Sequence, residues 1–397
     1  MRTLSAFTAG TLLLSALGCR EESAAPTEPE STSTAAVAAV TSTPAFTQVV
    51  VNGYTTCGLG TGQRAWCWGN NGVSGALGTG STHFFYSTTP LAVTGGLTFR
   101  QLTAGGYHNC GVTAEDRAYC WGQNDRGQLG DGTRTDRPAP VPVTGGLAFR
   151  SVSTNAYNTC GLTPGHKLYC WGDNNLSQLG DGTATTRLAP VPIAPGLSFQ
   201  QVSVGLVHSC AITLDYRAYC WGFNGHGEIG DSTRVDRSRP TRVADSRAYQ
   251  QVGAGATHTC AVTRGGKALC WGDGKEGELG WSKTSPSYWP RPVSGGLTFV
   301  RVKAGNQFTC GESASSRAYC WGYNLYGQLG DGTTENRLAP VAVVGGHTFQ
   351  QLTAGDSHVC GTTPDAVAYC WGYNGYGELG DGTLESRTAP LRVGGGA

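Results

Sequence analysis

The chain has 397 residues, including 61 glycines, 16 tyrosines and 10 tryptophans, and 14% of its residues are charged. Glycine at this level destabilises helices, so the composition favours a turn-rich β protein over a helical one. The formal net charge of +1 provides no large field that would draw the whole protein to nucleic acid or to an anionic membrane, which disfavours those two classes of partner.

The N-terminus carries an export signal. Arg2 precedes an apolar run that extends from Leu4 to Leu17, which is too short for a stable membrane span. The segment Leu14-Ser-Ala-Leu-Gly-Cys19 resembles a bacterial lipoprotein signal, although Ala16 stands where that signal usually has leucine. The resemblance implies lipidation of Cys19 and, since Arg20 is not aspartate, location in the outer membrane. An ordinary cleaved signal peptide, giving a secreted protein, is the alternative. In both cases residues 1–19 are a signal segment, and the protein is exported to the cell envelope or beyond it.

Residues 20–45 consist mainly of Ser, Thr, Ala, Pro and Glu. Such a segment has too few large apolar side chains to offset the entropy of ordering it. We expect a disordered tether that joins the signal segment to a folded domain at residues 46–397.

A repeat of period 50 fills the chain from Phe46 onward. Its clearest marker is Cys-Trp-Gly, which occurs seven times, first at Trp68 and last at Trp371. Short runs rich in Val, Phe, Tyr, Trp and Thr alternate with glycine-containing turns about every ten residues, which is typical of short antiparallel strands. A period near 50 indicates stacked units, and seven four-stranded units can close a ring. We therefore predict an all-β fold, a seven-bladed β-propeller of four-stranded antiparallel blades.

The repeat resembles that of the regulator of chromosome condensation family. The motifs that carry the resemblance are Ala354-Gly355-Asp-Ser-His358-Val-Cys360 and Trp371-Gly-Tyr-Asn374-Gly-Tyr-Gly377-Glu-Leu379-Gly380, and it extends over residues 46–397. It implies a seven-bladed propeller in which repeats are offset from blades and the two termini share one blade. The family includes guanine-nucleotide exchange factors, chromatin-binding proteins, ubiquitin-ligase adaptors and secreted β-lactamase inhibitors, so the fold alone selects no function.

Fourteen cysteines besides Cys19 form seven pairs, each with nine intervening residues. If Thr113 and Arg117 flank a three-residue turn, Cys110 and Cys120 lie directly opposite each other at a distance that a disulfide can bridge. Disulfides persist in exported proteins. We expect seven of them, one per blade: Cys57–Cys67, Cys110–Cys120, Cys160–Cys170, Cys210–Cys220, Cys260–Cys270, Cys310–Cys320 and Cys360–Cys370.

Metal binding is the alternative use of these cysteines, because a His-x-Cys pattern accompanies several pairs and could supply zinc ligands. The histidine is absent from three units, whereas both cysteines occur in every unit. We therefore expect no metal and no cofactor, with the histidines packed in strands. The histidines are His108, His208, His258 and His358, and their replacements are Thr55, Asn158 and Phe308.

An aspartate and an arginine six residues apart, such as Asp131 and Arg137, recur in five units and are lost together in the first and fifth. Joint loss favours an ion pair that braces a loop. Calcium binding is the alternative, but it requires several converging carboxylates and each loop offers one.

Every residue type that could be catalytic recurs with the repeat, so the sequence shows no asymmetric catalytic group. We expect no enzymatic activity.

Positions that vary between units are candidates for partner binding, because invariant positions serve the scaffold. Exposed aromatic side chains at such positions are typical of binding surfaces. The first group precedes the His-x-Cys position and should surround one mouth of the channel, and the second follows Cys-Trp-Gly. The third lies in the unusual loops of the first and fifth units. The first group contains Tyr54, Tyr107 and Tyr157; the second, Tyr323, Tyr326, Tyr373 and Tyr376; the third, Phe84, Phe85, Tyr86, Trp281, Tyr288 and Trp289.

These features favour an exported, monomeric binding module that engages a protein partner through one face of the propeller. Carbohydrate or cell-wall binding is the main alternative, since tyrosine and tryptophan also stack on sugars. Inhibition of an enzyme such as a β-lactamase would use the same face. Guanine-nucleotide exchange is disfavoured, because an exported chain meets no GTPase.

Overall fold

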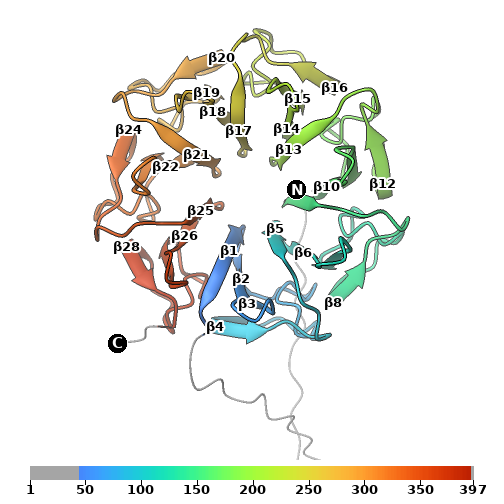
Figure 1. Ribbon diagram of the computed structural model, residues 1–397. Coiled ribbons are helices and arrows are strands. Elements are labelled where there is room, and N and C mark those ends of the chain that lie inside the picture. Colours follow the sequence, from blue (N-terminus) through green and yellow to red (C-terminus); the bar gives the residue numbers. More distant parts are fainter. Residues whose placement is uncertain (1–43, 395–397) are drawn as a thin grey trace, which may run out of the picture. The chain divides into compact units, whose positions relative to one another are not determined.

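Each sequence repeat forms one antiparallel sheet of four consecutive strands, and seven such sheets surround a central channel (Figure 1). The computed structural model describes residues 44–394. The expected signal segment with Cys19 and nearly all of the expected tether lie outside the described residues. Within residues 44–394, no helix is long and apolar enough to cross a membrane. The predicted seven-bladed propeller with four-stranded blades is confirmed.

We number the blades in chain order. Blade 1 contains β1 (Phe46–Asn52), β2 (Thr55–Gly60), β3 (Ala65–Asn70) and β4 (Tyr86–Ala92). Blade 2 contains β5 (Gln101–Ala104), β6 (His108–Val112), β7 (Ala118–Gly122) and β8 (Arg137–Pro142). Blade 3 contains β9 (Ser151–Asn155), β10 (Asn158–Leu162), β11 (Leu168–Gly172) and β12 (Arg187–Ile193). Blade 4 contains β13 (Phe199–Val204), β14 (His208–Thr213), β15 (Ala218–Gly222) and β16 (Arg237–Arg242).

The remaining blades repeat this pattern. Blade 5 contains β17 (Tyr249–Ala254), β18 (His258–Thr263), β19 (Ala268–Gly272) and β20 (Ser287–Pro292). Blade 6 contains β21 (Phe299–Ala304), β22 (Phe308–Ser313), β23 (Ala318–Gly322) and β24 (Arg337–Ala342). Blade 7 contains β25 (Gln351–Ala354), β26 (His358–Thr362), β27 (Ala368–Gly372) and β28 (Arg387–Arg392).

The first strand of each blade faces the channel and the fourth lies at the circumference, as β1 and β4 show (Figure 1). The channel has a volume of about 300 Å³ and is lined largely by Gln, Ser, Thr and small apolar residues of the inner strands. Lys303 and Asp356 are the charged residues that line it. The channel wall is therefore polar but nearly uncharged.

Ring closure differs from the expectation that the two termini share one blade. Blade 1 is complete in β1–β4 and blade 7 in β25–β28, so each repeat coincides with a blade and that expectation is wrong. The chain enters at the inner strand of blade 1 and leaves at the outer strand of blade 7. Closure then depends on contacts between these two blades. The Phe46 amide donates to the Ala366 carbonyl (2.8 Å), and Gln351 Nε2 donates to the Val49 carbonyl (3.1 Å).

We call the zone of contact between adjacent blades a seam. At every seam a fully buried tryptophan of one blade donates its indole N–H to a backbone carbonyl of the preceding blade. Trp271 of blade 5, for example, donates to Glu228 of blade 4 over 2.8 Å. At the closing seam Trp68 of blade 1 donates to Glu378 of blade 7, also over 2.8 Å. The closing seam therefore contains the same tryptophan hydrogen bond as the other six seams.

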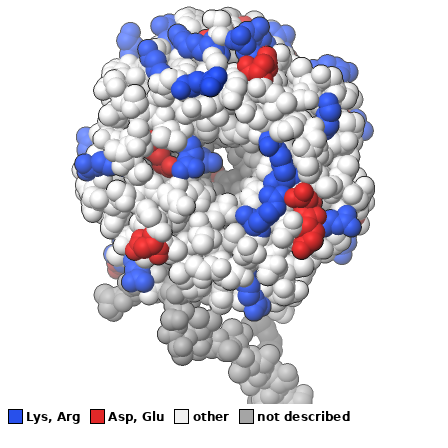
Figure 2. Space-filling model, viewed as in Figure 1, with Lys and Arg blue, Asp and Glu red and all other residues white. Residues whose placement is uncertain are grey.

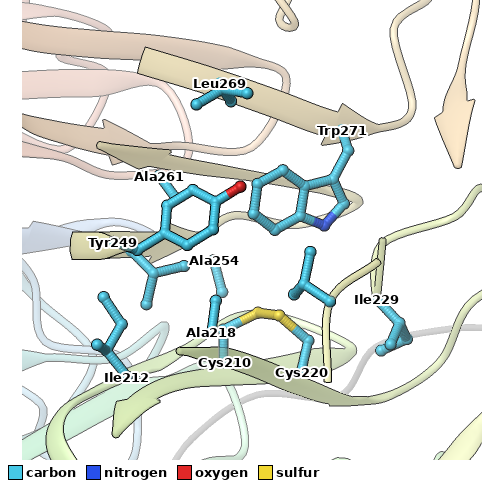
Figure 3. Packing of buried hydrophobic residues seen from close by; sticks show 12 residues of the cluster. Cys210, Ile212, Ala218, Cys220, Ile229, Tyr249, Ala254, Ala261, Leu269 and Trp271 are labelled. Atoms are coloured by element: carbon cyan, nitrogen blue, oxygen red, sulfur yellow. A yellow bond between two sulfur atoms is a disulfide. The ribbon is translucent and has the colours of Figure 1, made fainter. Parts of the chain in front are cut away.

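Apolar side chains fill each seam around this tryptophan. Figure 3 shows the seam between blades 4 and 5, where Tyr249 and Trp271 lie above the Cys210–Cys220 disulfide, with Ile212 to one side. All five residues are at most 1% exposed. Burial of apolar side chains is the main favourable contribution to folding. Neither of the two blades could cover these side chains alone, so the blades stabilise each other.

All seven predicted disulfides are present. Cys110 and Cys120 are directly opposite each other in the register of β6 and β7, with a Cα–Cα distance of 4.0 Å. The turn closes as expected, since the Thr113 amide donates to the Arg117 carbonyl (2.9 Å). Each disulfide joins the second and third strands of its own blade, so none crosses a seam.

The four histidines of the His-x-Cys positions are fully buried and act across seams. His108 Nε2 lies 3.0 Å from the Thr159 hydroxyl, which donates its proton to the Gln128 carbonyl (2.9 Å). The histidine Nε2 must therefore be the donor to the threonine. Burial lowers the pKa of His108 to about 3, so the ring is neutral at pH 7.

One of the three units without this histidine is equally informative. In blade 6, Phe308 replaces the histidine and Val359 of blade 7 replaces the threonine, and both belong to one buried apolar cluster. A polar pair and an apolar pair thus occupy equivalent places. The structure uses these histidines for packing, and residues 44–394 contain no group of three His, Cys, Asp or Glu side chains arranged for a metal ion.

The aspartate–arginine pairs form as the sequence predicts. Arg137 Nε donates to Asp131 Oδ2 (2.8 Å), and equivalent ion pairs occur in blades 3, 4, 6 and 7. Burial raises the pKa of Asp131, but hydrogen bonds from Thr133, Arg137 and Asn124 outweigh it and hold that pKa below its ordinary value. The aspartate is therefore ionised and braces the loop before the outer strand.

Candidate functional site

Two kinds of connection share one face of the ring. Because the strands of a blade are antiparallel, the turn between its first and second strands lies on the same face as the loop between its third and fourth strands. Tyr54 and Tyr107 belong to turns of the first kind. The loops of the second kind carry Tyr323 and Tyr326 in blade 6 and Tyr373 and Tyr376 in blade 7. Residues from two separately predicted groups are thereby placed on one surface.

These tyrosines form a continuous series of ring contacts. Tyr54 lies at the centre, with its ring centroid 6.0 Å from that of Tyr107, 5.6 Å from that of Tyr376 and 6.4 Å from that of Tyr373. Tyr373 continues to Tyr326 at 5.0 Å. Most of these pairs meet edge to face, the arrangement that the charge distribution of aromatic rings favours.

Two further contacts extend the series. Tyr326 reaches Tyr323 at 6.5 Å, and Tyr376 reaches Tyr86, the first residue of β4, at 6.4 Å. The seven residues come from four consecutive blades around the ring, namely blades 6, 7, 1 and 2. We call them the tyrosine cluster: Tyr54, Tyr86, Tyr107, Tyr323, Tyr326, Tyr373 and Tyr376.

The loop that carries Tyr373 and Tyr376 is held in place by Asn374, which is fully buried. Its amide nitrogen donates to the Thr383 and Glu385 carbonyls, both at 3.1 Å, while its amide oxygen accepts from the Leu379 amide at 2.9 Å. The equivalent Asn324 holds the blade 6 loop in the same way. The aromatic rings are therefore mounted on fixed loops, which lowers the entropy lost when a partner binds.

The hydroxyl groups of the tyrosine cluster are free. Tyr54 is 37% and Tyr86 46% exposed, and the other members are half-buried. Across residues 44–394, none of the seven hydroxyl groups makes a hydrogen bond to the protein. The cluster thus offers apolar ring surface together with unused donors and acceptors.

Acidic groups lie next to the cluster. Burial, followed by the negative charges of Asp356 and Glu378, raises the pKa of Tyr54. Burial also raises the pKa of Tyr373, with Glu378 as the next cause. The pKa of Glu378 is itself raised, to about 7, because the side chain is buried. The tyrosines are therefore neutral at pH 7, and the carboxyl groups around them are poorly solvated.

Sequence reasoning did not identify Asp356 and Glu378 as part of this site. A signal for Asp356 was present, because the equivalent position in the other units holds no charged residue. Those equivalents are Gly53, Gly106, Ala156, Leu206, Ala256 and Asn306. Glu378 had no such signal, since a Gln or Glu recurs at its position in most units.

The remaining predicted residues of blades 1 and 3 lie outside the tyrosine cluster. Tyr157 is 37% exposed in the turn between β9 and β10. Burial, followed by the neighbouring Tyr54 and Tyr157, raises the pKa of Tyr107. Phe84 is 60% exposed in the loop that leads to Tyr86, whereas Phe85 packs against the seam between blades 1 and 2. Tyr157 and Phe84 therefore extend the exposed aromatic surface, and Phe85 serves packing.

The fifth unit forms a second, separate aromatic group. The guanidinium carbon of Arg291 lies 5.0 Å from the ring centroid of Trp281 and 4.5 Å from that of Trp289. Arg234 lies 5.8 Å from the centroid of Tyr288. These rings already contact cations of the chain itself, unlike the tyrosine cluster.

Charge is divided unequally between the two faces. The turns between second and third strands, on the face opposite the tyrosine cluster, carry mainly basic residues, whereas the loops around the cluster carry mainly acidic ones. Figure 2 shows one face, on which basic side chains clearly exceed acidic ones and border the channel mouth. The small net charge of the chain therefore conceals a polarised ring. Examples are Arg117, Arg217, Lys267 and Arg317 on the opposite face, and Asp125, Glu276, Glu335 and Glu385 beside the cluster.

Comparison with known proteins places these features in a family. A family model described as RCC1-like domain matches residues 5–311, and models of the Regulator of chromosome condensation (RCC1) repeat match residues 315–361, 299–328 and 349–378. The Ultraviolet-B receptor UVR8 of Arabidopsis thaliana is 33% identical over 72 residues, which are 18% of this chain and 16% of the receptor. The match therefore spans about a sixth of that curated relative.

Two solved structures share the architecture. Human WBSCR16 aligns with a TM-score of 0.75 at 20% identity, over 83% of this chain and 93% of that one. Yeast RCC1 (Prp20), in its complex with Kap60, aligns with a TM-score of 0.73 at 17% identity, over 83% of each chain. At these identities the likeness shows the fold alone.

Proposed function

Because this chain belongs to the family of RCC1-like domains, whose propeller supports several functions, we propose that it is an exported binding module of the cell envelope. Its tyrosine cluster binds a protein partner, and it performs no catalysis. Lipid attached to Cys19 anchors it, and residues 20–45 serve as the tether.

The observation that carries this proposal is the tyrosine cluster itself. Seven tyrosines from four blades meet in one series of ring contacts, on fixed loops and with free hydroxyl groups. Tyrosine buries a large area for few rotatable bonds, which makes it a frequent centre of binding energy in protein interfaces. Buried packing would not require seven free hydroxyl groups.

Two further facts support the proposal. Yeast RCC1 (Prp20), which has a similar fold, is bound to the protein Kap60 in its crystal structure. The seven disulfides are typical of an oxidising compartment, which agrees with export.

Carbohydrate binding is the second candidate, because free tyrosine hydroxyl groups beside exposed rings also suit sugars. The two candidates differ in the class of molecule retained by the cluster, and treatment with glycan-degrading enzymes separates them.

The test is affinity capture from cell-envelope and culture fractions with the protein, with a Tyr54→Ala/Tyr376→Ala variant and with a Tyr288→Ala control. Tyr288 belongs to the separate aromatic group of blade 5. We expect a protein that the parent and the control retain and the double variant loses, with binding of the purified partner weakened about 30-fold. Equal recovery by all three baits would show that the cluster is not the binding site. Loss of recovery after glycan digestion would favour carbohydrate.

A further inference from the structure

The charged groups that act on the tyrosine cluster are all acidic. After burial, the causes that raise the pKa values of Tyr54, Tyr107, Tyr323 and Tyr373 are negative charges and neighbouring tyrosines. The acids are Asp356, Glu378 and Glu276, and no Lys or Arg appears among these causes. The cluster is thus an aromatic surface with a negative potential and no cation of its own.

Asp356 has no partner. It lies in the turn between β25 and β26, beside the turn of blade 1 that carries Tyr54, and it lines the mouth of the channel. Within residues 44–394, its carboxylate makes no hydrogen bond and no ion pair. Asp356 is half-buried at the channel, and burial raises the pKa of its carboxyl group. A cation bound there would compensate this partial loss of hydration.

Glu378 shows the same deficit deeper in the structure. Its side chain is 0% exposed. One carboxyl oxygen accepts from the Tyr376 amide (2.8 Å), and the other has no partner. Two unsatisfied acids therefore adjoin the central tyrosine of the cluster from blade 7.

Aromatic faces and an adjacent carboxylate together form the usual receptor for an organic cation, because the ring quadrupole attracts positive charge and the carboxylate neutralises it. Arginine suits such a site best, since its planar guanidinium stacks on rings and donates to carboxylates at the same time. The blade 5 group shows the pairing within this chain, where Arg291 lies against two tryptophans.

We infer that the tyrosine cluster, with Asp356 at its edge, binds an arginine or lysine side chain in a basic segment of the partner protein. The inference rests on the proposed function and deepens it, by naming the chemistry of the partner. The bound cation stacks on the exposed ring surface of Tyr54 and Tyr107 and pairs with Asp356. The acidic loops around the cluster steer the basic segment toward it.

The test uses the full chain and three synthetic peptides of equal length, with glycine alternating with arginine, glutamine or glutamate. Calorimetric titration measures their binding to the parent, to Asp356→Asn and to Glu115→Gln. The last variant is the control, because Glu115 is an exposed acid in the turn between β6 and β7, on the face opposite the cluster. We expect the arginine peptide to bind best and to lose about tenfold in affinity with Asp356→Asn, while the control changes little.

A second pair of variants separates the contribution of the Tyr54 ring to binding from that of its hydroxyl group. Tyr54→Phe keeps the aromatic face and should retain binding of the arginine peptide, whereas Tyr54→Leu should weaken it. Unchanged thermal unfolding would show that both variants are folded.

Two results would overturn the inference: equal binding of the arginine and glutamine peptides, or an unchanged affinity in Asp356→Asn. If the arginine peptide fails to bind while capture of a protein still depends on Tyr54 and Tyr376, the inference is wrong and the proposed function stands. If the parent and the Tyr54→Ala/Tyr376→Ala variant capture the same proteins, the proposed function is wrong. The Asp356→Asn result then still decides whether the cluster binds cations.

Discussion

The seams between blades are alike seven times over, whereas the tyrosine cluster occurs once. Every seam has a buried tryptophan that donates to a carbonyl of the neighbouring blade, and every blade has one disulfide. The positions equivalent to Tyr54 and Tyr107 hold Val207, Thr257, Gln307 and Ser357 in blades 4 to 7. Stability is therefore distributed around the ring, while recognition is confined to one sector. Substitutions in the two regions should separate these properties.

The largest effect is expected at a seam. Trp68→Ala removes a fully buried side chain and its bond to Glu378, and should lower the free energy of unfolding by about 3–5 kcal/mol. Chemical denaturation measures the change. Trp221→Ala, at a seam that the chain also bridges covalently, is the control. A much smaller loss for Trp68→Ala would show that the closing seam is not equivalent to the others.

The disulfides come next. Replacing Cys210 and Cys220 together by alanine should lower the free energy of unfolding by about 2–3 kcal/mol, because the unfolded chain regains the freedom of a short closed loop. The same double change at Cys110 and Cys120 should give a similar loss. Widely different losses at the two sites would contradict the view that the blades contribute equally.

The buried histidines should make stability depend on pH. The folded chain binds a proton at His258 only below about pH 3, while the unfolded chain does so below about pH 6.5, so stability falls as pH decreases between these values. His258→Phe/Thr309→Val copies the apolar pair Phe308–Val359 of blade 6. Its slope of unfolding free energy against pH should be shallower by about 1.4 kcal/mol per pH unit.

The titration of Glu278 and Glu378 changes the stability with pH in the opposite direction to that of the histidines. Both glutamates are present in the parent and in the double variant, so a difference between the two slopes reports on His258. Burial raises the pKa of each to about 7, so the folded state keeps a proton that the unfolded state releases above about pH 4.5. Their contribution to stability is present below pH 4.5 and lost as pH rises to about 7. Equal slopes for the parent and the double variant would show that His258 titrates normally in the folded chain.

The smallest effect on stability is expected in the tyrosine cluster. Tyr54→Ala should change the free energy of unfolding by less than about 1 kcal/mol, because the ring is 37% exposed and its hydroxyl group has no protein partner. Thermal unfolding measures this change, and partner capture measures binding. A loss as large as that of Trp68→Ala would make Tyr54 a packing residue and would remove the distinction between the two regions.

Much of the fold could be predicted from the sequence, because the repeat makes each structural interaction visible several times. Recurrence of both cysteines identified the disulfides, and joint loss of Asp and Arg identified the pair that Asp131 and Arg137 exemplify. The histidine–threonine bonds across seams could not be predicted, since they depend on how adjacent blades meet. Ring closure was predicted wrongly, because the resemblance implied a shared blade whereas the first repeat completes its own sheet.

The candidate site was predicted only in its parts. Tyr54, Tyr107 and Tyr376 were each singled out as variable aromatic positions, but in separate groups. Their convergence depends on the contact of blade 1 with blade 7, whose partners are some 300 residues apart in the chain, as Thr56 and His358 are. Periodicity within one repeat carries no information on such a contact. The structure also places the rings of the fifth unit outside this series of contacts, against Arg234 of the fourth unit and Arg291 of the fifth.

The position of the disulfides determines how the ring would respond to force. All seven lie within blades, and six seams are also bridged by the polypeptide that runs from one blade to the next. The seam between blades 7 and 1 is crossed neither by a disulfide nor by the polypeptide of residues 44–394. A pull applied between Phe46 and Arg392 therefore acts across the one seam that is held only by non-covalent contacts, among them the bond from Trp68 to Glu378 and the apolar cluster around it. Under tension we expect the ring to open at this seam first, while the disulfide in each blade still holds its second and third strands together.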